Sequence, residues 1–173
     1  MPRHYSKYPS LGILEALERW SFGGVPRKTF EQGLIKSKTA PNKKALSQKL
    51  YALRKCGFMK YKGAKAVITE KGYRYINFAK LDELKIENKK KDGFWRLIIF
   101  DIPEEKKAAR ELLRNKLNEF ECYQLQKSVY ATCFICEKEI AELVKLLAIG
   151  QHVCVVKAKS LGNREAAVAR HFG

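Results

Sequence analysis

Apolar residues follow a helical period in the first half of the chain and alternate between helical and strand-like periods in the second half. In the first half, leucines and isoleucines recur every three or four residues, which predicts three short helices ending near residue 56. Two β-rich runs then flank Lys62–Lys65 and predict a hairpin, with a short helix after it. The expected elements are helices at about 11–20, 26–35 and 42–56, a hairpin at 58–69 and a helix at 73–78.

The second half has the order strand, helix, strand, strand, helix, strand. The expected segments are 95–101, 109–120, 122–126, 129–136, 140–147 and 152–157. This order is typical of the ferredoxin-like (βαββαβ) fold, so the chain as a whole is predicted to be α+β. Two helices cover only one face of such a sheet, and we expect a homodimer that covers the other. The apolar residues expected at that interface are Leu97, Ile99, Val129, Val153 and Val155.

The net charge of the 173-residue chain is +17, and most of it lies in the first half. Residues 1–93 hold 22 Lys+Arg and 8 Asp+Glu, a net of +14, whereas residues 94–173 are at +3. A strongly basic half points to a polyanionic partner. No apolar run approaches the roughly 18 residues that span a bilayer, so no membrane contact is expected. Without a secretory pattern and with five cysteines, an odd number, a cytoplasmic protein with reduced thiols is expected.

Three helices followed by a hairpin are typical of a winged helix-turn-helix, and the third helix would meet double-stranded DNA with its polar outer face. The expected DNA-binding residues are Lys43, Lys44, Ser47, Gln48, Tyr51, Arg54 and Lys55 on the helix, with Lys60, Lys62 and Lys65 on the hairpin. Gln48 and Ser47 are the expected readers of base edges. The alternative is an ordinary solvated helix face. Residues 1–9 are interpreted as a frayed terminus or as an arm on nucleic acid.

These patterns divide the chain into four segments. They are a winged-helix domain at 8–80, a basic linker at 81–93, a ferredoxin-like dimerisation domain at 94–158 and a tail or short helix at 159–173.

Two sets of residues resemble known families. Ile68-Thr69-Glu70-Lys71-Gly72 is similar to the phrase that ends the wing in winged-helix regulators. Phe100–Glu104, Arg110 and Gln126–Tyr130 resemble the central domain of the phenylacetate-degradation repressor (PaaX) family and, more loosely, the small CRISPR-associated adaptation nuclease (Cas-two) family. The resemblance implies a short form of the PaaX repressors without their carboxy-terminal domain. No small-molecule effector is assigned.

The alternative between a regulator and an enzyme depends on the role of Asp101. In the Cas-two family the matching aspartates of two subunits are proposed to hold a divalent metal, so the resemblance implies Mg²⁺ or Mn²⁺ as an alternative cofactor. The residues themselves favour a local role, because Asp101-Ile102-Pro103-Glu104 has the form of a capping box. Cys133 and Cys136 point to opposite faces of a strand and are interpreted as structural.

The sequence therefore predicts a DNA-binding transcriptional regulator, a repressor acting as a dimer on a palindromic site, without a cofactor. The alternative is a metal-dependent nuclease or a CRISPR-adaptation subunit with a fused DNA-binding head.

Overall fold

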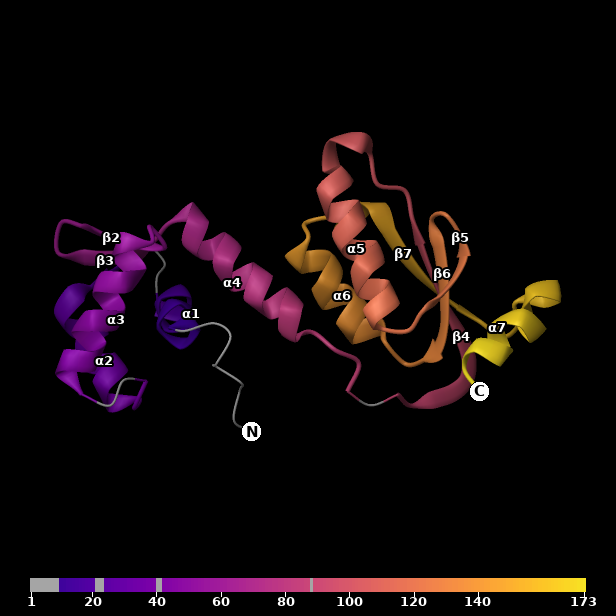
Figure 1. The fold of residues 1–173 in the computed structure, drawn as a ribbon, viewed down its shortest axis with the longest axis horizontal. Coiled ribbons are helices and arrows are strands. Elements are labelled where there is room, and N and C mark those ends of the chain that lie inside the picture. The colour runs from indigo at the N-terminus through magenta and orange to yellow at the C-terminus, as the bar shows by residue number, and fades with distance from the viewer. Residues whose placement is uncertain (1–9, 21–23, 40–41, 88) are drawn as a thin grey trace. The chain divides into compact units, whose positions relative to one another are not determined.

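The computed structural model of the chain describes residues 10–20, 24–39, 42–87 and 89–173. Its contacts divide the chain into two compact units, residues 1–82 and 83–173 (Figure 1). The expected arm at residues 1–9 lies outside the described residues. In the described part of the chain, no helix has the length and apolar character needed to cross a bilayer.

The first unit packs four helices against a small antiparallel sheet with the strand order β1-β3-β2. Its predicted helices and hairpin are all present, and the last helix is longer than expected. The sequence did not predict the two-residue strand β1. In chain order the elements are α1 (Leu11–Trp20), β1 (Val25–Pro26), α2 (Arg27–Lys36), α3 (Lys43–Lys55), β2 (Met59–Lys62), β3 (Lys65–Ile68) and α4 (Glu70–Glu83).

One apolar core holds these elements together, and every helix contributes to it. The side chains of Leu14, Phe30, Leu34 and Ile76 are completely buried there. Burial of each such side chain contributes about 1.5–3 kcal/mol. The core therefore orients α3 by its leucine side and leaves the opposite side of that helix in solvent.

The second unit is a four-stranded antiparallel sheet with the strand order β5-β6-β4-β7. This is the predicted ferredoxin-like arrangement, and Figure 1 shows α5 and α6 on the same side of the sheet. Its main elements are β4 (Lys91–Phe100), α5 (Lys107–Glu119), β5 (Tyr123–Gln126), β6 (Val129–Phe134), α6 (Glu137–Leu146), β7 (Val153–Ala158) and α7 (Glu165–His171), with short 3₁₀ turns at Glu104–Lys106, Gly150–His152 and Gly162–Arg164.

The predicted linker is shorter in the structure than the range 81–93. Helix α4 continues to Glu83, and β4 already begins at Lys91, which pairs with Phe134 of β6. The lysine run Lys89–Lys91 of the predicted basic linker therefore ends at the first residue of the sheet.

The predicted tail also packs on its own unit. The ring of Phe172 lies 5.4 Å from the ring of Phe134 and 6.0 Å from that of Trp95. Trp95 Nε1 donates to Glu165 Oε1 at 3.4 Å. Helix α7 is thus part of the second unit.

Candidate nucleic-acid interface

Helix α3 begins at a side-chain cap and is oriented by its apolar side. Asn42 Oδ1 accepts a hydrogen bond from the backbone N–H of Ala45 at 2.8 Å. Leu46, Leu50 and Leu53 are buried on the core side. With this side fixed, the polar residues between the leucines lie in solvent.

All ten predicted DNA-binding residues are exposed, and they come from α3 and the β2–β3 hairpin. We call this set the interface surface. None of its lysines and arginines makes an ion pair with a described residue. The set comprises Lys43, Lys44, Ser47, Gln48, Tyr51, Arg54, Lys55, Lys60, Lys62 and Lys65.

The interface surface has no carboxylate in its own stretch of sequence. Between Glu31 and Glu70 there is no Asp or Glu, while there are ten Lys and Arg residues. Unpaired cations without carboxylates repel one another and cost the fold some stability. Such an arrangement is typical of a surface that binds phosphates.

The hairpin that carries three of these lysines turns tightly between Lys62 and Lys65, which face each other across the two strands. Gly63 lies in the turn with φ +59°, in the left-handed region that favours glycine. The turn therefore places the lysine side chains at the tip and along the edge of the first unit.

Two residues of the predicted wing phrase, Ile68–Gly72, are held by contacts with the residues just before the hairpin. Thr69 Oγ1 donates to the carbonyl oxygen of Gly57 at 2.6 Å and accepts from the backbone N–H of Gly72 at 3.1 Å. A Cβ atom at Gly72 would lie 2.0 Å from the carbonyl oxygen of Phe58. Thr69 and Gly72 thus join the start of α4 to the segment between α3 and the hairpin.

Sequence reasoning missed Tyr61 and Arg27. The half-buried ring of Tyr61 has the guanidinium carbon of Arg27 at 4.8 Å and that of Arg54 at 5.0 Å from its centroid. Burial is the main cause that raises the pKa of Tyr61. For Tyr61 the sequence did contain a signal. Met59 and Tyr61 alternate with lysines in β2, so their side chains lie on the side of the strand opposite the lysines.

In the second unit, the prediction that Asp101 caps a helix was wrong. Asp101 is exposed, and its carboxylate makes no hydrogen bond or ion pair with a described residue. Extended backbone at Pro103 and a 3₁₀ turn separate it from α5, which begins only at Lys107. Glu104, the other half of the expected capping box, instead accepts from Arg110 at 2.7 Å.

The other members of the same motif are held by contacts at one end of the sheet. Arg110 also donates to the carbonyl oxygen of Ile102 at 3.1 Å. Arg114 donates to that of Lys127 at 3.0 Å, and the backbone N–H of Phe100 donates to that of Ser128 at 3.0 Å. These contacts involve Phe100, Ile102, Arg110, Lys127 and Ser128 of the residues that carry the resemblance.

Comparison with protein families identifies the second unit. Residues 88–169 match the family described as the PaaX protein central Cas2-like domain. The second unit is a PaaX-like domain. Comparison with curated proteins and with solved structures found no match.

The matched range includes most of α7 and so agrees with its packing on the sheet of the PaaX-like domain. Among the described residues, no group of three or more His, Cys, Asp or Glu side chains is placed to hold a metal ion. Cys136 is buried where α6 begins, and burial raises the pKa of its thiol to about 12. This supports a structural role for Cys136.

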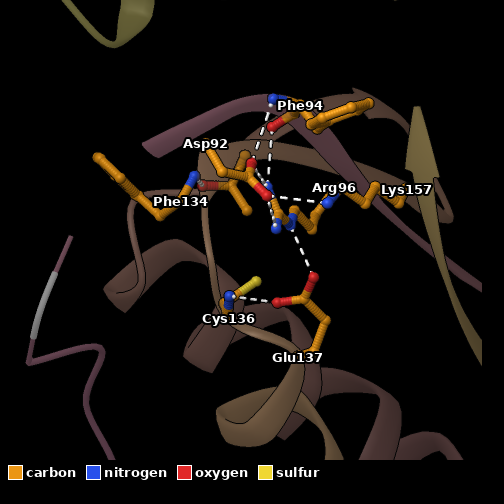
Figure 2. Close-up of polar contacts among 8 residues, drawn as sticks. Asp92, Phe94, Arg96, Phe134, Cys136, Glu137 and Lys157 are labelled. Atoms are coloured by element: carbon orange, nitrogen blue, oxygen red, sulfur yellow. Dashed lines mark hydrogen bonds and ion pairs between the residues drawn. The ribbon is translucent and has the colours of Figure 1, made fainter. Parts of the chain in front are cut away.

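The PaaX-like domain also contains a charged cluster around one buried arginine, which the sequence did not predict. Figure 2 shows the guanidinium of Arg96 between the carboxylates of Asp92 and Glu137. Arg96 is only 2% exposed and donates to Glu137 Oε1 at 2.8 Å and to Asp92 Oδ2 at 2.8 Å. Lys157 donates to the same Asp92 oxygen at 2.9 Å. The hydrogen bonds from Arg96, and then from Lys157, hold the pKa of Asp92 well below its usual value.

The predicted dimer interface needs a correction in β7. Val153 and Val155 pair in register with Phe100 and Ile98, which are buried beneath the helices. Directly opposite residues share a face, so these two valines do not lie with Leu97, Ile99 and Val129.

We call the face opposite α5 and α6 the open face, and α7 covers only the part of it at Trp95 and Tyr123. On this face β7 presents Cys154 and Val156, paired with Ile99 and Leu97. Val156 is 40% exposed and Ile99 39%. A valine-rich strand has apolar residues on both sides, so alternation alone did not show which set faces outward.

Proposed function

We propose that the chain is a transcriptional repressor that binds double-stranded DNA through the interface surface and pairs with a second copy through the open face of its PaaX-like domain. The family match supports the regulatory role. The single observation that carries DNA binding is the exposed basic surface without carboxylates on α3 and the hairpin.

Helix α3 enters the major groove in this proposal. Ser47 and Gln48 lie towards its N-terminal half, the part from which recognition helices contact base edges. Glutamine suits adenine, whose major-groove edge offers one donor and one acceptor. The lysines of the hairpin contact phosphates and provide affinity without sequence preference. Repression is steric, since a dimer on a two-fold related site blocks the polymerase.

The experiment is a salt titration of duplex binding by the double variant Lys44→Ala, Lys55→Ala. Each lost phosphate contact lowers the slope of log affinity against log salt by about 0.9, so the slope falls by roughly 1.8. The matched control is Lys138→Ala, Lys145→Ala, which removes two exposed lysines from α6. An unchanged slope in the first variant contradicts the proposal.

Dimerisation has a test of its own. The open face retains the exposed apolar side chains of Ile99 and Val156, and association would remove them from water. Light scattering on the full chain is expected to give a dimer mass, and Ile99→Lys is expected to give a monomer. A wild-type monomer at high micromolar concentration contradicts the dimer.

One observation favours a second candidate, a metal-dependent nuclease. The carboxylate of Asp101 is exposed and has no partner in the described part of the chain, and a dimer would supply a second one. Two such carboxylates suit Mg²⁺ or Mn²⁺. Cleavage of DNA or RNA by the purified wild type with these metals, lost in Asp101→Asn, would establish this activity.

A further inference from the structure

A hollow lies between α3 and β2 within the first unit. It has a volume of about 440 Å³ and is lined by Tyr51, Arg54, Lys55, Met59, Lys60 and Tyr61. Three of these side chains are cationic and none is acidic, while buried Met59 and half-buried Tyr61 form its apolar part. The lining is therefore suited to an anion.

The two arginines next to Tyr61 differ in what they bind. Arg27 donates to Glu31 at 2.7 Å, so its charge is already compensated. The side chain of Arg54 makes no hydrogen bond or ion pair with a described residue, although its guanidinium carbon lies 5.0 Å from the ring centroid of Tyr61. The ring thus holds a planar guanidinium in place and leaves its N–H donors free.

The position of Arg54 decides which part of a duplex it meets. Arg54 and Lys55 lie in the last turn of α3, whereas recognition helices contact bases from their N-terminal residues. A fixed guanidinium with free donors matches the two oxygens of a phosphate. Lys55 and Lys60 also line the hollow and add to its positive charge.

We propose that this hollow binds one phosphodiester group of the DNA backbone, with Arg54 as its bidentate ligand and Tyr61 as the positioning residue for Arg54. The site rests on the proposed DNA binding and adds to it a specific phosphate position. It also explains why a tyrosine stands between the lysines of β2, because its ring face, rather than its hydroxyl, holds the arginine.

The test uses a duplex recovered by in vitro selection with the wild-type protein, with single neutral methylphosphonate linkages placed at each backbone position in turn. Arg54→Gln is expected to lower affinity roughly tenfold, as for a lost hydrogen bond to a charged group, and to lower the salt slope by about 0.9. At one backbone position, the methylphosphonate is expected to weaken the wild type and to leave Arg54→Gln unaffected.

Two variants of Tyr61 separate positioning from general damage. Tyr61→Phe keeps the ring face and is expected to bind as the wild type does. Tyr61→Leu is expected to lose affinity, and the loss should disappear when Arg54→Gln is already present, because the two residues act as one unit. Arg74→Gln, an exposed arginine of α4 paired with Glu70, is the charge-matched control and should bind normally.

The outcomes distinguish this site from the proposed function. A wild type that selects no duplex overturns DNA binding and the phosphate site with it. A wild type that binds while Arg54→Gln keeps its affinity and slope overturns the phosphate site alone. Additive losses in Tyr61→Leu and Arg54→Gln overturn the positioning role of Tyr61.

Discussion

The basic side chains of the interface surface and those of the PaaX-like domain are arranged in opposite ways. On the interface surface, no lysine or arginine makes an ion pair with a described residue. In the PaaX-like domain, Arg96, Arg110, Arg114 and Lys157 each donate to a carboxylate of the same domain. Cations that bind carboxylates of their own fold contribute to its structure. Unpaired cations remain available to a partner.

This difference shows why net charge alone is an incomplete guide to binding. Each domain contains many lysines and arginines, and the total does not tell which of them are paired. Removal of a paired cation such as Arg96 should lower the stability of the PaaX-like domain, whereas removal of a cation from the interface surface should lower DNA affinity.

The largest expected effect is on the charged cluster around Arg96. Arg96→Met removes the cation between Asp92 and Glu137, and breaking a buried ion pair by removing one partner costs about 3–5 kcal/mol. We expect the lower end of this range, because both carboxylates are partly exposed. Denaturant unfolding followed by circular dichroism measures the loss. Arg164→Met, an exposed arginine with no ion pair to a described residue, is the control and should change little. Equal stabilities of the two variants would contradict the comparison.

A smaller effect is expected where backbone packing, rather than charge, supports the interface surface. Gly72→Ala places a Cβ atom 2.0 Å from the carbonyl oxygen of Phe58, and overpacking of this kind costs about 1–3 kcal/mol. Thermal unfolding should show the loss in the first unit. In the control Gly150→Ala, the new Cβ would make only an ordinary contact of 3.7 Å with Val144. Equal melting temperatures of both variants and the wild type would show that the joint between α4 and the hairpin segment tolerates a shift.

Acid should destabilise the PaaX-like domain through its paired carboxylates. Hydrogen bonds from Arg96 lower the pKa of Asp92, and those from Arg110 lower the pKa of Glu104. Such groups stabilise the fold above their unfolded pKa of about 4, and this contribution is lost as the pH falls through the lower folded value. Melting temperatures measured from about pH 6 down to pH 2.5 should fall less steeply in Asp92→Asn than in the wild type. Parallel curves would contradict the role of Asp92.

The smallest effect is expected at Asp101, whose carboxylate has no partner among the described residues. Asp101→Ala should change the free energy of unfolding by no more than about 0.5 kcal/mol. The contrasting variant is Asn42→Ala, because Asn42 does cap a helix, and loss of such a cap costs about 0.5–2 kcal/mol. Chemical denaturation of both variants provides the measurement. A larger loss at Asp101 than at Asn42 would restore the capping hypothesis.

Local patterns in the sequence determined the order of elements and the composition of the interface surface. Helical and strand-like periods predicted the helices and strands of both units except the two-residue strand β1, because each element depends on the residues three, four or two positions away. The exposed residues of α3 followed from its buried leucines in the same way. The family resemblance rested on short phrases, and the family comparison confirmed it for residues 88–169.

Only the tertiary structure decided which polar groups are paired and which faces are open. The partners of Arg96 include Glu137, 41 residues away, and Lys157 reaches Asp92 across 65 residues. No periodicity connects positions so far apart. The alternating residues of β7 were assigned to the wrong face for the same reason, since both sets are apolar and only pairing with β4 distinguishes them. Asp101 and Glu104 satisfied the spacing of a capping box, but Arg110 bound Glu104 and an intervening 3₁₀ turn moved the start of α5 away from Asp101. Contacts between distant segments form only when the whole domain folds. No local pattern in the sequence therefore shows which of these contacts will replace a local one.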